Sequence, residues 1–384
     1  MYLFVIEFIL FGIYYLLLST LPVHIMQIDG TLGTVGLVMG VAAPIAAIFT
    51  PISGYLIDNW HDKRMITIGL TLNLGSLLFL PFIKLTALFV MVDFFRRLGT
   101  ATTGAATRSR ILDLLPYHRR GEGISIFTTS HNLGTALMPP IGLFILNNYG
   151  FTGVAGFCVL LILIGFAIIQ LLDAPLRLTD NMQEDLNRRL SITGFKHSLK
   201  LASWVPPLTL LIMVIAFFGC LTFIPLISEE RSISEYYSFF TVYGFTVFIS
   251  RLFVGRFSDR YGRELIIIPC IILCSIAMVI LAFSYSLPAL WLTAVMFGIG
   301  WGSAFPTLLA LASDYSADNT EGQTMSIMSA SFSIGTALGG GLVGGISQYF
   351  TFELSFLLLA VLLLLTLVIF SIDFRSQRLT KTKR

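Results

Sequence analysis

Twelve long apolar segments, separated by short polar connections, dominate the sequence. They lie at residues 3–23, 35–57, 65–83, 86–107, 121–147, 151–172, 206–228, 236–254, 265–284, 288–312, 322–347 and 354–372. Each has about the length of the ~20-residue helix that crosses the hydrocarbon core of a bilayer. In lipid, a segment must satisfy its own backbone groups as a helix or within a closed barrel, and strand-type alternation is absent here. The pattern therefore predicts an all-α integral membrane protein with twelve transmembrane helices.

The composition excludes an ordinary soluble protein. Hydrophobic residues make up 56% of the chain and charged residues only 12%, whereas about 25% charged residues is usual in a globular chain. The connections leave no room for a further soluble domain. The first apolar segment has no basic region before it and no small-residue cleavage site, so we expect a retained helix rather than a signal peptide.

The basic residues predict the orientation in the membrane. With the N-terminus in the cytoplasm, cytoplasmic connections and the C-terminal tail hold 20 of the 24 Lys and Arg residues. The four exceptions are Lys84, Arg231, Arg96 and Arg97. Because cytoplasmic loops are enriched in positive charge, we expect both termini in the cytoplasm of a multi-pass plasma membrane protein. The short loops and compact size favour a bacterial inner membrane.

The sequence repeats itself at an offset of 201 residues. The segment GEGISIFTTSHNLGTAL at 121–137 aligns without a gap with the segment that begins at Gly322. The same offset relates Gly54 to Gly255 and Gly99 to Gly300. A consistent register across several helices indicates two copies of one six-helix unit. Such duplication is typical of transporters, in which the substrate site lies near the midplane between the halves.

The repeat predicts the domain organisation. We expect an N-terminal six-helix bundle at 1–172, a cytoplasmic central linker at 173–205, and a C-terminal six-helix bundle with a short cytoplasmic tail at 206–384. The linker mixes both signs of charge and contains the longest non-apolar stretch of the chain.

A charged decapeptide, GRFSDRYGRE at 255–264, follows the second helix of the second half. It resembles the loop signature G-x-x-x-D-R-x-G-R of the major facilitator superfamily. The matching residues are Gly255, Asp259, Arg260, Gly262 and Arg263, and the first half keeps Gly54 and Asp58 of a degraded copy. The resemblance implies a cytoplasmic gate, in which ion pairs between the halves form when the inner side is closed. The alternative is a tight turn whose charges only determine topology.

The fifth segment resembles a second pattern, the G-x-x-x-G-P-x-x-G motif of exporters in that superfamily. In GTALMPPIG, the residues Gly134, Pro139 and Gly142 match, whereas Met138 replaces the glycine before the proline. The resemblance implies a flexible fifth-helix hinge at the seam between the halves. Close helix packing is the alternative reading of the glycines.

The resemblance covers essentially the whole chain and is strongest to the twelve-helix drug:proton antiporter branch. It implies the major facilitator fold, transport by alternating access, and an intramembrane arginine in the fourth helix, best matched by Arg96 with Arg97 as the alternative. Asp93 lies three and four residues before them, so either arginine can neutralise it. Charged residues at membrane depth are costly and are functional candidates by default.

Three further polar residues are candidates for proton coupling or substrate binding. Glu7 is the only acid in the first helix, and His131 with Asn132 lies midway along the fifth. Glu7 either carries a proton, because burial raises a carboxyl pKa, or is a helix N-terminal carboxylate stabilised by the helix dipole. Asp93 is the rival proton carrier, unless it forms a permanent structural pair with an arginine. His131 either titrates near neutral pH or only hydrogen-bonds within the bundle.

Aromatic residues are the candidates for a substrate cavity. Tyr14 in the first half and Tyr243, Trp301 and Phe305 in the second can line a wall for an amphipathic organic molecule. Each of them can equally be a packing residue in a chain with 33 phenylalanines.

The sequence thus predicts a proton-coupled exporter of a small organic molecule, either a drug-like compound or a metabolite. Uptake of a sugar or organic acid and export of a metal-chelating metabolite of the siderophore type remain alternatives. No nucleotide-binding loop, metal-ligand spacing or catalytic constellation is present in the sequence. We therefore expect a non-enzymatic, monomeric transporter without cofactor or metal. Its partners are expected to be its substrate, protons and the lipid bilayer, and not nucleic acid.

Overall fold

The computed structural model describes residues 2–41, 62–83, 85–114, 120–171, 204–316 and 321–381. The chain divides into two compact units, Met1–Gln183 and Glu184–Arg384, referred to below as the N unit and the C unit. All regular elements in the described residues are helices, as the apolar pattern predicts. The predicted linker at 173–205 lies almost wholly outside the described residues.

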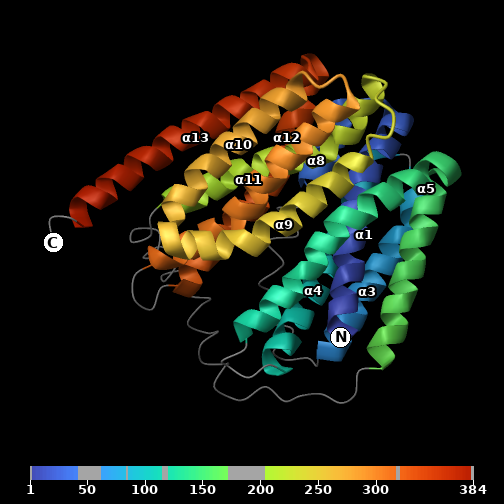
Figure 1. Cartoon of the computed structure of the whole chain (residues 1–384). Coiled ribbons are helices and arrows are strands. Elements are labelled where there is room, and N and C mark those ends of the chain that lie inside the picture. The colour runs from blue at the N-terminus through green and yellow to red at the C-terminus, as the bar shows by residue number, and fades with distance from the viewer. Residues whose placement is uncertain are drawn as a thin grey trace. The chain divides into compact units, whose positions relative to one another are not determined.

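The N unit is built from long helices whose apolar faces pack on one another (Figure 1). Its elements are α1 (Tyr2–Asp29), a short apolar helix at Leu32–Val41, α3 (Asp62–Phe79), the 3-10 turn η1 (Leu80–Phe82), α4 (Thr86–Leu114) and α5 (Arg120–Gln170). The most extensive packing is of α1 on α5 and of α3 on α4. Helix α3 also contacts α5, and α4 has a smaller contact with α1.

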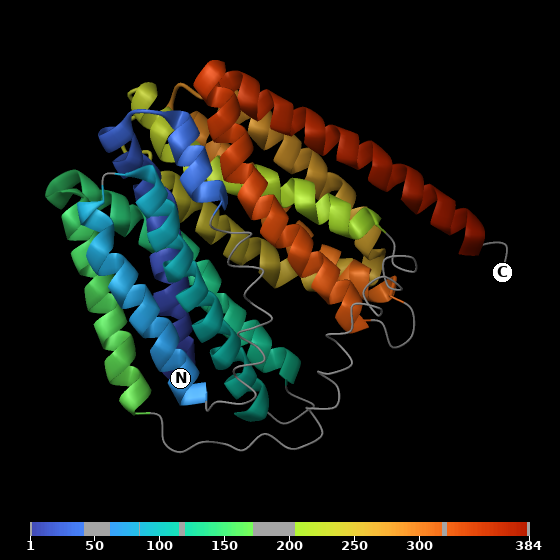
Figure 2. The same ribbon diagram turned by 180° about the vertical axis from the view of Figure 1, so that it is seen from behind.

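Helix α5 is a pair of spans joined at one residue. Gly150 has φ 66° and ψ −176°, a conformation that only glycine adopts without strain. At ~1.5 Å per residue, the 51 residues of α5 are more than twice as long as the ~30 Å hydrocarbon core. In both views the two limbs meet at this turn and diverge away from it, so the chain reverses direction there (Figures 1 and 2). The predicted boundary between segments ending at 147 and starting at 151 is therefore confirmed.

The described residues of the C unit form six long helices. They are α8 (Val205–Glu230), α9 (Ser238–Tyr261), α10 (Arg263–Ala282), α11 (Leu287–Asp314), α12 (Glu321–Tyr349) and α13 (Phe352–Lys381). Helix α10 packs on α11 and α13, α12 packs on α8, and α9 packs on α11. Their bounds agree with the last six predicted segments, apart from extensions at several ends.

Within the described residues, nine helices are long and apolar enough to cross a membrane. One of these, at Ser130–Gln170, contains both limbs of α5, and α4 is not among the nine because charged residues interrupt it. The second predicted span is described only as far as Val41. The total of twelve spans therefore stays a prediction.

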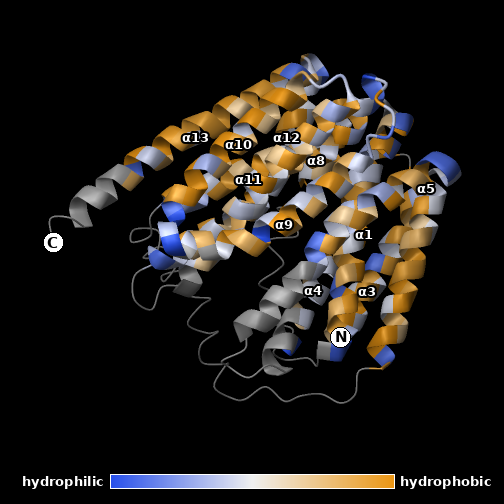
Figure 3. Cartoon of the chain, viewed as in Figure 1, coloured by the Kyte–Doolittle hydropathy of each residue, from blue (hydrophilic) through white to orange (hydrophobic). Residues whose placement is uncertain are grey.

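The outer surface of the helices suits lipid. On α13, the exposed apolar residues Val361, Leu364, Leu365 and Val368 recur at helical spacing. Figure 3 shows the hydrophobic colour along α10 and α13, with hydrophilic residues gathered near helix ends. A soluble protein rarely exposes such continuous apolar surface.

The internal repeat has a counterpart in the packing. On α4, a Cβ atom at Gly99 would lie 2.5 Å from the carbonyl oxygen of Gly69 on α3. On α11, a Cβ atom at Gly300 would lie 2.8 Å from the carbonyl oxygen of Cys270 on α10. Both residues of the first contact precede those of the second by 201 residues. The same close helix crossing, possible only without a side chain, thus occurs once in each unit.

Candidate functional site

One face of α1 carries Glu7, Phe11 and Tyr14, which are four and three residues apart and therefore lie above one another. The Glu7 side chain is fully buried. Thr107 on α4 donates its hydroxyl hydrogen to Glu7 Oε2 at 2.9 Å. His131 on α5 places Nε2 3.2 Å from Glu7 Oε1. Three helices of the N unit thus converge on one carboxyl group.

The His131 ring is held by stacking as well as by Glu7. It lies 3.3 Å from the Phe11 ring, with the two planes 22° apart. The His131 side chain is 24% exposed, whereas Glu7 has no exposure. This pair can carry one proton on either partner, since both a neutral pair and an ion pair leave no net charge behind. Both residues were candidates from the sequence alone, but the contact between them could not be predicted from it.

A second polar group lies on α4. Asp93 accepts hydrogen bonds from Arg96 Nε at 2.7 Å and from Arg97 Nε at 2.6 Å, on different carboxylate oxygens. All three side chains are at least nine-tenths buried. The spacing of three and four residues predicted both contacts, and both are present.

Tyr14 covers the two arginines. Its ring centroid lies 6.0 Å from the Arg96 guanidinium carbon and 5.8 Å from that of Arg97. Since Glu7 and Tyr14 are two helical turns apart, about 10 Å of helix axis separates the carboxyl–imidazole pair from the arginines. We call the whole group the polar cluster; its members are Glu7, Tyr14, Asp93, Arg96, Arg97, Thr107 and His131. Asn132, the remaining candidate here, is half-buried beside His131.

The corresponding positions of the C unit are apolar. At 201 residues beyond Glu7, Asp93, Arg96, Thr107 and His131 stand Leu208, Ala294, Phe297, Leu308 and Phe332. Phe297 is fully buried. The two copies of the unit have therefore diverged at their centres, one toward charge and the other toward hydrophobic packing.

The C unit instead holds a closed circuit of aromatic rings, which we call the aromatic cluster. Its members are Phe217, Phe218, Trp301, Phe305 and Phe332, from α8, α11 and α12. Neighbouring centroids around the circuit are 4.4–5.8 Å apart, and the closest pair, Phe217 and Trp301, is stacked with planes 10° apart. Trp301 is 5% exposed, whereas Phe305 and Phe332 are half-buried. Such ring pairs stabilise beyond their buried area.

The predicted cavity residues therefore differ from one another. Trp301 and Phe305 belong to the aromatic cluster. Tyr243 is buried against Phe239 and Phe297, with centroids 6.2 Å away in each case. Tyr14 belongs to the polar cluster of the other unit. These roles could not be separated from the sequence alone, because all four are large aromatic residues in apolar helices.

The predicted gate is described only in part. Gly54, Asp58 and the side chain of Asp259 lie outside the described residues. Gly255 is exposed, and a Cβ atom there would meet no atom within 4 Å among the described residues, so no close helix approach occurs at this glycine in the C unit. Arg260 lies 5.5 Å from the ring of its neighbour Tyr261.

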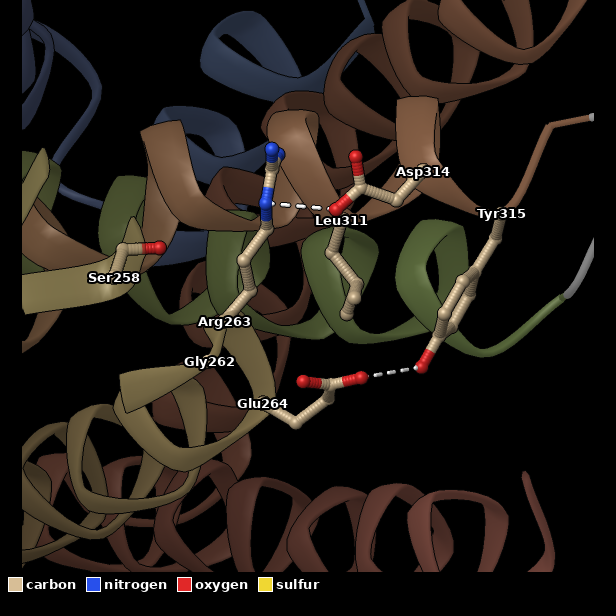
Figure 4. A pocket seen from close by; sticks show the side chains of 7 residues that line it. All are labelled: Ser258, Gly262, Arg263, Glu264, Leu311, Asp314 and Tyr315. Atoms are coloured by element: carbon tan, nitrogen blue, oxygen red, sulfur yellow. Dashed lines mark hydrogen bonds and ion pairs between the residues drawn. The ribbon is translucent and has the colours of Figure 1, made fainter. Parts of the chain in front are cut away.

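The end of the motif contacts α11 of the same unit. Gly262 turns the chain between α9 and α10 with φ 96°. Arg263 Nε then lies 2.7 Å from Asp314 Oδ2, and the Tyr315 hydroxyl donates to Glu264 Oε1 at 3.0 Å (Figure 4). Burial and the Glu264 carboxylate both raise the pKa of Tyr315, so the phenol stays protonated as a donor at neutral pH.

These side chains line a cavity of about 330 Å³ at the junction of α9, α10 and α11. Arg263 and Glu264 point into it from one side and Asp314 and Tyr315 from the other (Figure 4). The pair joining Arg263 and Asp314 lies within one unit. The sequence predicted pairs between the halves, and pairing through Asp259 stays a prediction.

The predicted hinge residues pack on α1. A Cβ atom at Gly134 would lie 3.1 Å from the backbone nitrogen of Gly12, and one at Gly142 would lie 2.5 Å from Leu16 Cγ. The chain remains helical through Pro139. Met138, which replaces the motif glycine, fills the space above Gly12. The glycines thus support helix packing within the N unit, and their role as a hinge stays a prediction.

A comparison with known families identifies the fold. The family model described as Major Facilitator Superfamily matches residues 3–240 and 230–384, nearly the whole chain. The chain belongs to the major facilitator superfamily. The nucleoside transporter NupG, a solved structure, superposes with a TM-score of 0.78 at 13% sequence identity, covering 97% of this chain and 99% of that one. At this identity the likeness shows the fold alone.

Two curated members of the superfamily bear on the direction of transport. The staphylopine export protein of Staphylococcus aureus is 23% identical and covers 91% of this chain and 89% of its own length. The 3-(3-hydroxy-phenyl)propionate transporter of Escherichia coli is 34% identical over 84 residues, 22% of this chain and 21% of its own length. The protein is accordingly a membrane transporter and not an enzyme.

Proposed function

We propose that the protein exports a small organic molecule in exchange for protons, by alternating access. The observation that carries the proposal is the fully buried Glu7 carboxyl between Thr107 and His131. A buried carboxyl beside an imidazole can hold one proton as a neutral pair or as an ion pair, and release of that proton leaves a buried carboxylate that favours taking up the next one, which suits a proton carrier. Among side-chain groups, imidazole is the one whose ordinary pKa lies nearest to neutral pH.

Export is supported by the likeness to the staphylopine export protein along 91% of the chain. Uptake of an organic acid is the second candidate, because the relative named for 3-(3-hydroxy-phenyl)propionate is more identical, although over only 84 residues. The polar cluster itself is compatible with both directions, since antiport and symport need the same protonation step.

The proposal is tested in inside-out vesicles with an acidic lumen, using staphylopine and 3-(3-hydroxyphenyl)propionate as probes. An exporter that exchanges protons accumulates an external probe in the lumen while protons leave. A symporter carries both out of the lumen and accumulates nothing. Lumenal pH and radiolabelled probe are followed together.

We expect Glu7→Gln to abolish substrate-dependent proton release. His131→Phe, which copies the residue at the equivalent position of the C unit, is expected to weaken it strongly. Glu235→Gln, at an exposed acid in the loop after α8, serves as the matched control and should behave as wild type. Wild-type proton release in both Glu7→Gln and His131→Phe vesicles would show that the proton is carried elsewhere.

A further inference from the structure

The polar cluster has an unequal number of charges around Asp93. One carboxylate, with no exposure, is shared by two guanidinium groups that are 3% and 8% exposed. Arginine does not lose its proton in proteins, so this part of the cluster carries one positive charge more than the described carboxylate between the two arginines balances. Glu7 lies about 10 Å further along α1 and is already engaged by Thr107 and His131.

The hydrogen bonds of the two arginines show which guanidinium nitrogen has no acceptor among the described residues. Arg97 uses Nε on Asp93 and directs Nη2 to the carbonyl oxygen of Met39 at 3.4 Å. Arg96 uses both Nε and Nη2 on the same oxygen, Asp93 Oδ1, at 2.7 and 2.6 Å. Its Nη1 is buried and has no acceptor among the described residues. Nη1 therefore offers two N–H groups that the described protein atoms leave unused.

A water molecule would accept one of these hydrogen bonds but would not balance the charge. An anion does both, and a carboxylate matches the planar donor geometry of a guanidinium group. Buried cations without a counter-charge are strongly disfavoured in a membrane interior. Arg96 Nη1 thus lacks both a hydrogen-bond acceptor and a balancing negative charge among the described residues.

We propose that the transported molecule carries a carboxylate group and that Arg96 Nη1 binds it. This inference rests on the proposed transport function and specifies its substrate class. The Tyr14 ring, 6.0 Å from the Arg96 guanidinium carbon, is placed to contact the organic part of the same molecule. The equivalent residue of the C unit is Phe297, so the repeat offers no second arginine at this position.

Equilibrium binding to the purified full-length protein in detergent tests the proposal without any proton gradient. The probes are staphylopine, 4-hydroxybenzoate and 3-(3-hydroxyphenyl)propionate, with the uncharged primary amides of the two aromatic acids as matched competitors. We expect wild type to bind at least one aromatic acid about tenfold or more tightly than its amide, as one charge-assisted hydrogen bond allows. Arg96→Gln should bind acid and amide equally, and Arg96→Lys should retain only part of the preference.

Arg64→Gln, at an exposed arginine of α3, is the control and should keep the wild-type preference. Arg96→Gln leaves Asp93 paired with Arg97 alone, so we expect its thermal midpoint without ligand to equal or exceed that of wild type. This result separates loss of binding from loss of folding. Glu7→Gln should keep the acid preference even where it abolishes proton release, which separates failure of this inference from failure of proton coupling.

Three results would overturn the proposal. The first is that no acid in the panel binds wild type, or that each aromatic acid binds no better than its amide. The second is that Arg96→Gln keeps the preference. The third is that chloride or inorganic phosphate at equal concentration displaces the bound acid, which would make the atom a general anion site.

Discussion

Replacing Arg231 with glutamine removes the side chain that closes the C-terminal end of α10. The Arg231 side chain is 4% exposed and lies between α8 and α9. Its guanidinium donates to the carbonyl oxygens of Leu281, Ala282 and Ser284 at 2.7–3.0 Å and to Glu353 Oε1 at 2.7 Å. The last carbonyls of a helix have no partner within the helix. This one side chain donates to two of them, those of Leu281 and Ala282, and to the carbonyl of Ser284 just beyond the helix, and it ties α10 to α13.

The expected loss follows from these contacts. A hydrogen bond to a charged group contributes about 1.5–3 kcal/mol, but water can reach some of the released groups because Glu353 is 28% exposed. Arg231→Gln loses all four hydrogen bonds, so with that discount we expect it to destabilise the C unit by about 3 kcal/mol. Glu353→Gln keeps the three carbonyl bonds and should cost about 1 kcal/mol.

The cysteines allow each unit to be followed separately. Cys220, Cys270 and Cys274 are buried in the C unit, and Cys158 is buried in the N unit. In a Cys158→Ala background, a fluorogenic maleimide added during heating reports only the opening of the C unit. By the size scaling of soluble domains, about 3 kcal/mol corresponds to a fall of about 6–12 °C in the midpoint.

Two outcomes would refute this reasoning. An Arg231→Gln midpoint equal to that of wild type would mean that water replaces all four hydrogen bonds without loss. If Glu353→Gln lowered the midpoint as much as Arg231→Gln, the stability would come from the ion pair and not from the hydrogen bonds at the helix end.

The remaining predictions concern the glycines and the ion pair of the C unit, measured with the same thiol assay. Gly300→Ala should lower the midpoint, because overpacking costs about 1–3 kcal/mol. Gly255→Ala should leave it unchanged or raise it, because its Cβ meets no described atom within 4 Å and alanine favours a helix by up to about 1 kcal/mol over glycine. Equal effects would contradict the close crossing. Gly262→Ala should destabilise by about 1–2 kcal/mol through its positive φ. Arg263→Gln should cost less than about 1 kcal/mol, because Asp314 is 49% exposed; the reverse order would show that the ion pair and not the turn stabilises this corner.

The spacing of residues along one helix was sufficient to predict part of the polar cluster. Asp93 contacts Arg96 and Arg97 because residues three and four apart meet on any helix. The break at Gly150 was likewise readable, since a glycine between two apolar segments favours a turn.

Contacts distant in sequence could not be predicted in this way. Glu7 and His131 are separated by 124 positions and meet only because α1 packs on α5. The motif in the fifth segment marked Gly134 as a candidate for close packing. No motif marked Gly12, the residue on α1 that it contacts. Asp314 was not among the site residues predicted from the sequence, because its pairing with Arg263 depends on how α10 and α11 meet.

The single-residue turn at Gly150 also bears on motion. Without a connecting loop there is no slack between the two limbs of α5, so a tilt of one limb is passed directly to the other. The first limb carries His131 and contacts α1 through Gly134. A rearrangement at the carboxyl–imidazole pair that shifts the end of the first limb would therefore also shift the start of the second limb, because both meet at Gly150.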